Sequence, residues 1–390
     1  MSEIKVSVII PFHNGEEYLD ETMKYITGQT LKEIEIICVD DESTDRTVEM
    51  LREYEKQDNR ITVLTQKKAN AGVARNLGMQ QATGEYLLFL DSDDLFEEDM
   101  LEKMYLACKE QQAEVCVCNA DQYDMEQEIF VDKPQYLRKK LLPEQIPFSK
   151  ETIGKYILYF TTSVPWNKMV KRTFVKENDI SFQNIARAND QFFSIMILLL
   201  ADRITVVTDK LVHYRVRQKE NLTTKFSETP LCAYEAMLAV KEKLDELHLL
   251  DDADVKCALE NKILNLMIYS LNIQNTKEGY QLLYDTLKED GFSKLGITVR
   301  NEDFYFNPLE YRNLCYMMEN SCDEFLFLKN REYRDTISRK NIQYKDMVRQ
   351  RDDKAKQVKQ KEKEIQRIKE SKRYQMASKV ANLYDKILRK

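Results

Sequence analysis

The sequence of 390 residues has no long hydrophobic run and little glycine or proline, nine and seven residues respectively. Its longest nearly unbroken apolar stretch, Phe192 to Ala201, is about half of the ~20 residues that a membrane-spanning helix needs. The first thirty residues have no basic start, apolar centre and small-residue cleavage site. We therefore expect neither an integral membrane protein nor an exported one, and we predict a cytoplasmic location.

The sequence also lacks several short motifs. Its eight cysteines form no CxxC pair and have no histidine at metal-ligand spacing, so we interpret them as buried free thiols in a reducing compartment. No GxxxxGK[ST] occurs, which argues against a P-loop ATPase or kinase, and no GxGxxG follows the first expected strand, which argues against a dinucleotide enzyme.

Charge is distributed unevenly along the chain. Residues 331–390 contain 20 Lys and Arg against 9 Asp and Glu, a net charge of +11, whereas the first 330 residues carry −18. The tail has neither glycine nor proline, which predicts one or two long helices. A basic helix suits a polyanionic surface, and charge alone does not choose between nucleic acid and anionic lipid.

The tail has two apolar patterns. One heptad position carries Ile337, Tyr344, Val358 and Ile365 but is broken by Arg351, so we expect at best a weak coiled coil. From residue 372 onward an apolar stripe lies among basic residues. This pattern is typical of an interfacial helix on an anionic membrane, and equally of a helix that docks on its own body domain or on a partner.

Strand-like and helix-like segments alternate between residues 5 and 120, which predicts an α/β fold with a mostly parallel sheet and helices on both faces. Beyond Pro230 the chain is almost wholly helical. We predict a catalytic domain over 1–225, a helical domain over 226–330 and a basic helical tail over 331–390. The expected strands are 6–10, 34–39, 61–64, 86–90, 114–118, 204–207 and 211–215. The expected helices are 16–27, 47–54, 71–81, 98–111, 153–160 and 191–201, with an excursion or hairpin over 121–148.

Carboxylates cluster after two of these strands, at 40–45 and at 91–94. Ligands of open α/β sheets lie beyond the carboxyl ends of the strands. Crowded carboxylates repel one another unless a cation neutralises them, and Mg²⁺ or Mn²⁺ is commonly shared between one or two carboxylates and substrate phosphates. Asp91 and Asp93 have the spacing for this role. The alternative is that these residues only form turns and helix caps, but two clusters at successive strand ends favour a metal site.

Six sequence blocks, taken together and in order, resemble the inverting nucleotide-sugar glycosyltransferases of family 2, which have the GT-A fold. The resemblance covers about residues 4–225, and each block alone is a weak signal. Residues 6–11, VSVIIP, resemble the family's opening strand, residues 39–45, VDDESTD, are similar to its VDDGSTD motif, and residues 70–78 match NxGxxxARNxG. The blocks are 6–11, 39–45, 70–78, 84–94, 165–168 and 188–193, the last four reading NAGVARNLG, GEYLLFLDSDD, PWNK and ANDQFF.

The resemblance implies a role for individual residues. It makes Asp190 the catalytic base, although a charge at the start of the following helix is the alternative. His13 would lie beside the nucleotide base, Asp41 would accept a hydrogen bond from it, and Asp91 would face the ribose. The full implied set is Pro11, His13, Asn14, Asp41, Arg75 and Asp91 for the nucleotide, Asp93 and His213 for the Mn²⁺ or Mg²⁺ ion, and Trp166 and Asn189 for the acceptor or donor sugar. Trp166 has a core anchor as its alternative role.

The implied chemistry is a single displacement. A bound cation neutralises the leaving nucleoside diphosphate, and a carboxylate accepts the proton of the attacking hydroxyl, which inverts the anomeric carbon. Three residues depart from the family pattern: Glu42 replaces a glycine, Asn189 replaces a glutamate and His13 replaces a tyrosine. The Q/RxxRW block and membrane helices of processive synthases are absent, so we expect a single-addition enzyme.

We expect the donor to be a nucleotide diphosphate sugar, specifically a UDP-sugar. The acceptor would be a lipid-linked or cell-surface glycan, the tail could hold the protein peripherally on the inner face of the membrane, and nucleic acid is not an expected partner. Two alternatives remain. A sugar nucleotidyltransferase would usually carry a glycine-rich, basic loop after the first strand, where this chain has HNGEE. An inert scaffold would need none of Asp41, Asp93 and Asp190.

Overall fold

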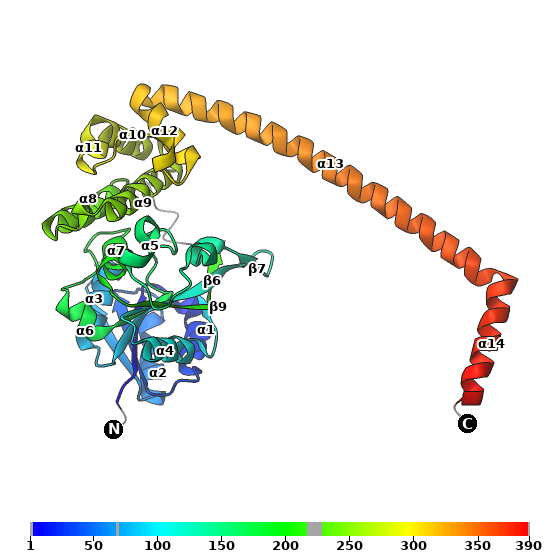
Figure 1. Ribbon diagram of the computed structural model, residues 1–390. Coiled ribbons are helices and arrows are strands. Elements are labelled where there is room, and N and C mark those ends of the chain that lie inside the picture. The colour runs from blue at the N-terminus through cyan, green and yellow to red at the C-terminus, as the bar shows by residue number, and fades with distance from the viewer. Residues whose placement is uncertain (1–2, 68–69, 217–227, 389–390) are drawn as a thin grey trace. The chain divides into compact units, whose positions relative to one another are not determined.

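The computed structural model describes residues 3–67, 70–216 and 228–388, and the chain forms two compact units, residues 1–319 and 320–390 (Figure 1). The first unit therefore contains both the α/β part and the helices that follow it. The boundary expected near residue 225 falls in 217–227, outside the described residues. The division at 225 and 330 stays a prediction.

The first unit is built on one nine-stranded sheet of described residues, in the order β3-β2-β1-β4-β8-β6-β9-β5, with β7 paired to β6. The strands β1 to β4 pair in parallel, as predicted. The strand β8 then runs antiparallel between β4 and β6, so the second half of the sheet is mixed. The strands are β1 Val6–Phe12, β2 Ile34–Asp41, β3 Ile61–Gln66, β4 Tyr86–Phe89, β5 Leu95–Phe96, β6 Val115–Asp124, β7 Ile129–Asp132, β8 Lys168–Lys171 and β9 Ile204–Val216.

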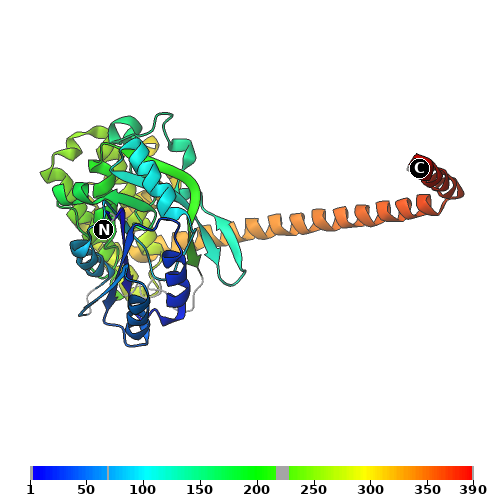
Figure 2. The ribbon, with the colours of Figure 1, turned by 90° about the horizontal axis from the view of Figure 1, so that it is seen from below.

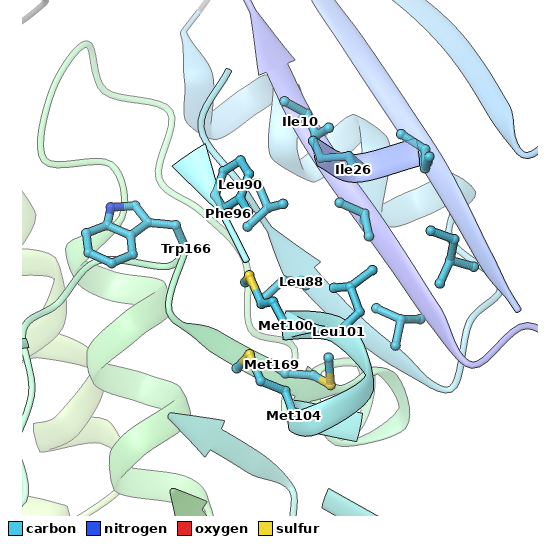
Figure 3. Close-up of a cluster of buried hydrophobic side chains, with 14 of the residues drawn as sticks. Ile10, Ile26, Leu88, Leu90, Phe96, Met100, Leu101, Met104, Trp166 and Met169 are labelled. Carbon is cyan, nitrogen blue, oxygen red and sulfur yellow. The ribbon is translucent and has the colours of Figure 1, made fainter. Parts of the chain in front are cut away.

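Helices cover both faces of this sheet (Figures 1 and 2). Alternate residues of β1 point to opposite faces. Val8 and Ile10 join a buried cluster with apolar residues of α1, α2 and α4, whereas Ile9 contacts Gly78 of α3 on the other face. Figure 3 shows part of the first cluster, where Met100 is drawn next to Leu88 and Met104 next to Met169. The helices of this part are α1 Glu16–Thr27, α2 Thr47–Gln57, α3 Ala71–Gln81, α4 Met100–Gln111, α5 Lys150–Ile153, α6 Arg172–Glu177 and α7 Gln191–Leu200.

Two expectations about the middle of the chain were wrong. The two short strands expected at 204–207 and 211–215 form the single strand β9, which pairs with β6 through a register shift between Cys118 and Ala120. This irregularity lets one strand continue where the sequence pattern breaks. The helix expected over 153–160 is only the short α5 and a 3-10 turn at 154–156, because Gly154 has a positive φ of 57°. The expected hairpin is present as β6 and β7.

The rest of the first unit is helical, as predicted. The long helix α9 buries Leu259, Ile263 and Met267, which are spaced for one helix face. Its neighbours supply further buried apolar residues. The helices are α8 Cys232–Glu246, α9 Ala253–Asn272, α10 Lys277–Thr286, α11 Phe292–Lys294 and α12 Pro308–Glu319.

The second unit consists of two helices, α13 Cys322–Glu370 and α14 Lys372–Leu388, which confirms the expectation of one or two long helices. Ser321 begins α13 with a capping box that includes Glu324. The heptad residues Ile337 and Tyr344 are 58% and 64% exposed, so no part of the described chain covers them. No helix among the described residues has the length and apolarity to cross a bilayer. All eight cysteines are free and seven are buried, as interpreted from the sequence.

Candidate active site

The glycines of α3 let this helix approach two neighbours closely. A Cβ atom at Gly78 would lie 2.5 Å from the Ile9 side chain, and one at Gly72 would lie 2.5 Å from the carbonyl oxygen of Gln183. Both contacts are shorter than real Cβ atoms allow. The glycine at 78 therefore seats α3 on the sheet, and the glycine at 72 admits the loop that precedes α7.

Asparagine side chains of the same helix hold this loop in place. The Asn76 amide donates from Nδ2 to the carbonyl of Phe182 over 2.8 Å and accepts from the Phe182 N–H over 2.9 Å. At the start of α3, Asn70 caps the helix through the Val73 N–H and donates to Asn184 over 2.8 Å. The ring of Phe182 stacks on Phe193 of α7. The loop that leads to Asp190 is thus fixed to α3 at several points.

Arg75 joins three segments that are distant in sequence. Its guanidinium donates to Asp91 after β4, with Nη2 and Oδ1 2.6 Å apart, and to Oδ1 of Asn189 over 3.3 Å. The arginine is buried and lies 5.4 Å from the centroid of the Phe182 ring. These contacts place Asp91, Asn189 and Arg75 together beside Asp190.

Asp190 precedes the first residue of α7, at the N-terminus of that helix. Its Oδ1 accepts a hydrogen bond from the side chain of Gln191 over 3.3 Å. Burial raises the pKa of Asp190, the charge of Asp91 raises it further, and the charge of Arg75 lowers it. Burial and the two neighbouring charges thus act on the carboxyl that the resemblance assigns as base, and a base works best when its pKa lies near the working pH.

The loops after β1 and β2 are tied to each other by hydrogen bonds. The backbone N–H of Asn14 donates to Ser43 Oγ over 2.9 Å, and Oδ1 of Asn14 accepts from the N–H of Thr44 over 2.8 Å. His13 is exposed, and its Nδ1 lies 2.8 Å from the carbonyl oxygen of Asp41, so Nδ1 carries the proton and donates. Pro11 is half-buried in β1 just before this loop. The structure thus brings His13, Asn14 and Asp41 together.

Two further features shape the edge of the sheet where β1, β2 and β3 end, which we call the rim. The carboxylate of Asp41 accepts a hydrogen bond from Nε2 of Gln66 at the end of β3, over 2.8 Å. The sequence analysis did not single out Gln66, although β3 ends at the same edge as β2. Glu42, which replaces a glycine, has a φ of 60°. The turn keeps the left-handed conformation that favours glycine, and the glutamate adopts it at a cost.

The carboxylates after β4 form a concentrated negative site. Asp94 is fully buried, its Oδ1 accepts from the backbone N–H of Arg215 over 3.0 Å, and its Oδ2 has no partner among the described residues. Burial raises the pKa of Asp94, and the charges of Asp93 and Asp91 raise it further. Oxygen donors of this kind suit Mg²⁺ or Mn²⁺. No group of three or more His, Cys, Asp or Glu side chains with metal-binding geometry occurs within the described ranges. A cation that takes one or two carboxylates and completes its coordination with phosphates and water needs no such group.

His213 and Trp166 have contacts that bear on their predicted roles. Both ring nitrogens of His213 face carboxylates, with Nδ1 2.6 Å from Asp121 and Nε2 3.0 Å from Glu97. His213 would have to release one of them to bind a metal ion, so its role as a ligand stays a prediction. Trp166 is 2% exposed and packs against Tyr136, at the edge of the cluster in Figure 3. This position fits the core anchor, and its part in sugar binding stays a prediction.

Two lysines that the sequence analysis did not single out for a role also lie near Asp190. Lys168 is 1% exposed, and its ammonium donates to the carbonyls of Thr162 and Val164 and to Oδ1 of Asn167 over 2.7 to 2.8 Å. Burial lowers its pKa to about 7, and the positive charge of Lys262 adds to this effect. Burial likewise lowers the pKa of Lys262 to about 8, which the charge of Asp190 opposes. Lys168 is the last residue of the PWNK block, although the sequence analysis assigned it no role, and Lys262 lies in none of the sequence blocks.

The fold and the site together define a class of protein. In its fold the chain is similar to a solved fragment of TarS from S. aureus, in complex with UDP-GlcNAc, with a TM-score of 0.65 and 22% identity over 85% of this chain and 92% of that one. This likeness confirms the expected GT-A fold, a curled mixed sheet flanked by helices.

Sequence comparison identifies the family. The model of glycosyl transferase family 2 matches residues 7–196. The glycosyltransferase GlyG of Streptococcus pneumoniae serotype 4 is 34% identical over 233 residues, which are 58% of this chain and 75% of that protein. EpsH of Bacillus subtilis strain 168 is 30% identical over 251 residues, 62% of this chain and 71% of the relative. The chain belongs to glycosyl transferase family 2, and it is a glycosyltransferase. This assignment sets aside the nucleotidyltransferase and inert-scaffold alternatives.

Proposed function

We propose that the protein is a metal-dependent, inverting glycosyltransferase that moves a sugar from a UDP-sugar to a hydroxyl group of a glycan or lipid-linked acceptor. The observation that carries this proposal is the position of Arg75. It ties Asp91, at the strand end that would meet the donor, to Asn189, the neighbour of the candidate base. The buried guanidinium of Arg75 would thus fix the position of the donor-side residue Asp91 relative to the loop that carries the candidate base.

The donor nucleotide would lie over the loops after β1, β2 and β4. His13 presents an exposed ring for contact with the nucleotide base, and its hydrogen bond to the Asp41 carbonyl fixes the ring orientation. The Asp41 carboxylate is oriented by Gln66 and could accept a hydrogen bond from the base. A uracil offers such an N–H donor. The S. aureus relative solved with UDP-GlcNAc supports UDP as the nucleotide.

Asp93 would hold the Mn²⁺ or Mg²⁺ ion, with Asp91 facing the ribose beside it. When bound, such a cation offsets the negative charge that develops on the leaving diphosphate. Burial raises the pKa of Asp94, and the charges of Asp93 and Asp91 raise it further; a cation at this strand end would offset the contribution of these charges.

Asp190 would accept the proton of the acceptor hydroxyl as that hydroxyl attacks the anomeric carbon. Burial raises its pKa and so makes it a stronger base than an ordinary exposed aspartate, and the charge of Arg75 opposes this rise. Because one carboxylate acts without a covalent intermediate, the sugar configuration inverts.

The tail would bring the enzyme to its acceptor. With a net charge of +11 over residues 331–390, helices α13 and α14 suit an anionic lipid surface, and a peripheral position on the inner face of the cell membrane is part of this proposal. Flotation with vesicles tests it. Binding to vesicles with phosphatidylglycerol, lost in 0.5 M salt and absent with phosphatidylcholine alone, would support it, and equal binding to both lipids would contradict it.

The donor site is tested by thermal stability of the purified protein with a panel of nucleoside diphosphates, each with and without Mn²⁺. A ligand at 100 times its dissociation constant adds ~2.7 kcal/mol to the free energy of unfolding. We expect UDP to raise the melting temperature in the presence of Mn²⁺ and far less with EDTA. Equal stabilisation in EDTA would contradict the metal role, and no stabilisation by UDP would contradict the donor assignment.

A further inference from the structure

Thr22 lies in the middle of α1, and its hydroxyl makes a hydrogen bond outside its own helix. A threonine within a helix commonly donates to a carbonyl of the preceding turn. Thr27 of the same helix does this, with its Oγ1 2.8 Å from the carbonyl oxygen of Met23. Oγ1 of Thr22, which is fully buried, instead donates to the carbonyl oxygen of Ser92 over 2.8 Å. This hydroxyl therefore connects α1 to the loop that follows β4.

Ser92 lies between the two aspartates of that loop that the proposed function uses. Residues 91–94 form the turn from β4 to β5, and Ser92 separates Asp91 from Asp93. The Ser92 carbonyl belongs to the peptide unit that joins Ser92 to Asp93. Because a peptide unit is planar, holding its carbonyl oxygen also fixes the direction of the Asp93 N–H and the position of its Cα atom. The Thr22 hydroxyl thus controls how the Asp93 side chain leaves the turn.

Other contacts hold the two ends of the same turn. At its start, the carboxylate of Asp91 accepts a hydrogen bond from Arg75 of α3 over 2.6 Å. At its end, Asp94 accepts from the backbone N–H of Arg215 over 3.0 Å, and β5 then pairs with β9. Thr22 acts at the centre of the turn, between these two anchors. Elements from both faces of the sheet and from β9 therefore set the conformation of this one turn.

We propose that Thr22 is a positioning residue for the divalent cation of the donor site. The inference rests on the proposed function, in which Asp93 holds that cation. Thr22 acts through the Ser92 carbonyl and is not itself a ligand. Groups that orient a metal ligand commonly change metal affinity by about 10- to 100-fold when they are removed. Without the hydroxyl, the Ser92 carbonyl would face an apolar group, and the cost of an unsatisfied acceptor would favour a different conformation of the turn.

The competing account is that the Thr22 hydroxyl only stabilises the packing of α1 against the turn. In that case, its loss would lower the melting temperature but leave the metal affinity of the folded protein unchanged. A positioning role instead changes the Mn²⁺ concentration at which UDP binding is half-maximal. The two accounts therefore differ in a quantity that does not depend on turnover.

The test measures binding of labelled UDP to the full-length protein by equilibrium dialysis, at a fixed UDP concentration and increasing Mn²⁺. Thr22→Val removes the hydroxyl and keeps the branched shape, and Thr22→Ser keeps the hydroxyl. Thr27→Val is the matched control, because its hydroxyl bonds within α1. We expect the half-maximal Mn²⁺ concentration to rise at least about tenfold in Thr22→Val, to rise less than about threefold in Thr22→Ser, and to stay within about twofold in Thr27→Val.

The wild type is measured first, so that the two proposals fail in different ways. UDP binding by the wild type that does not depend on Mn²⁺ would overturn the metal role in the proposed function, and the positioning role with it. If the wild type depends on Mn²⁺ but Thr22→Val needs no more of it, only the positioning role is overturned. An equal rise in Thr22→Ser or in Thr27→Val would also overturn it, because the hydroxyl of Thr22 would not be the cause.

A further variant and the melting temperature cover a failure to fold. The melting temperature without ligands is measured for every variant. If Thr22→Val does not fold, Thr22→Cys takes its place, because a thiol is only a weak donor. We expect the half-maximal Mn²⁺ concentration to rise at least about threefold in Thr22→Cys. An unchanged value would overturn the proposal, as would a folded Thr22→Val protein that binds no UDP at any Mn²⁺ concentration, since the nucleotide loops would then be disturbed as well.

Discussion

The donor side and the acceptor side of the candidate site are built from different kinds of interaction. On the donor side, Asn14 and Asp41 each make hydrogen bonds to neighbouring loops, so the rim is ordered before any ligand binds. On the acceptor side, Asp190 and Lys262 have few partners and pKa values shifted mainly by burial. This difference is the one that our proposal requires: an ordered surface for the nucleotide, and a carboxyl group with few hydrogen-bond partners for the proton transfer.

The largest expected effect is on the acceptor side. Asp190→Asn keeps the shape of the side chain but removes the base, so we expect UDP-sugar turnover to fall by about 10²- to 10⁴-fold. UDP binding with Mn²⁺ should be unchanged within about twofold, because the donor rim is intact. Turnover and UDP affinity are measured on the same preparation. An equal loss of UDP affinity would show that the two sides are not separable.

Arg75→Gln should affect both sides of the site, because Arg75 contacts Asp91 on the donor side and Asn189 on the acceptor side. It leaves the Asp91 carboxylate without its cation and frees Asn189, so we expect the free energy of unfolding to fall by ~3 kcal/mol. Arg46→Gln is the matched control, because the Arg46–Glu49 pair is exposed on both sides and should contribute less than ~0.5 kcal/mol. Chemical denaturation of both variants measures the difference. Equal stabilities would mean that Arg75 is not the structural link proposed here.

Gly72→Ala should disturb the acceptor side alone. The new Cβ would meet the Gln183 carbonyl at 2.5 Å, so α3 and the loop before Asp190 must separate. Overpacking of this kind costs ~1–3 kcal/mol. We expect lower turnover at unchanged UDP affinity, measured together with thermal stability. A variant that keeps full turnover and stability would show that the loop has room that the structure does not indicate.

The pH dependence of turnover tests how burial and neighbouring charges set the pKa of the candidate base, Asp190. Burial raises the pKa of Asp190, and the base is active only when it is ionised. As the pH falls, turnover should therefore be lost at a pH above about 3.9, which is the pKa of an ordinary aspartate. Arg75 lowers this pKa, so Arg75→Gln should move the acid limb to higher pH. The profile of kcat/KM reports both. If the acid limb of the kcat/KM profile lies at the same pH in Arg75→Gln and in the wild type, the charge of Arg75 does not act on Asp190.

The smallest effect concerns the donor rim. Glu42 adopts a φ of 60°, where glycine is favoured, so Glu42→Gly should raise the free energy of unfolding by ~0.5–1 kcal/mol. Glu53→Gly is the control, because it places glycine within α2 on an exposed position and should lower stability by ~1 kcal/mol. Thermal melts of the two variants should shift in opposite directions. A loss of stability in both would show that the turn does not strain Glu42.

How much the sequence predicted also differs between the two sides. The donor loops follow strands directly, so the alternation of segments was enough to place Asp41 and Asp91 at one edge, and helices α1 and α3 were predicted with the bounds that the structure has. Lys168 and Lys262 come together only through the antiparallel strand β8 and the helix α9. Local pattern carries no information on such a pairing, because it depends on how distant elements pack.

The mixed half of the sheet escaped prediction for a related reason. The break between 207 and 211 suggested two strands, but pairing with β6 through an irregular register keeps one strand continuous. The same strand places His213 against Asp121 and Glu97, partners that no spacing in the sequence suggested. Tertiary pairing, rather than local propensity, decided both points.

The stereochemistry of donor hydrolysis tests the central claim most directly. Wild-type protein is incubated with UDP-α-sugars and Mn²⁺, and the released sugar is followed by proton NMR before its anomers equilibrate. A single displacement assisted by Asp190 predicts the β anomer first, at a rate that Asp190→Asn lowers by at least about 10²-fold. Release of the α anomer first, or an unchanged rate in Asp190→Asn, would contradict the account.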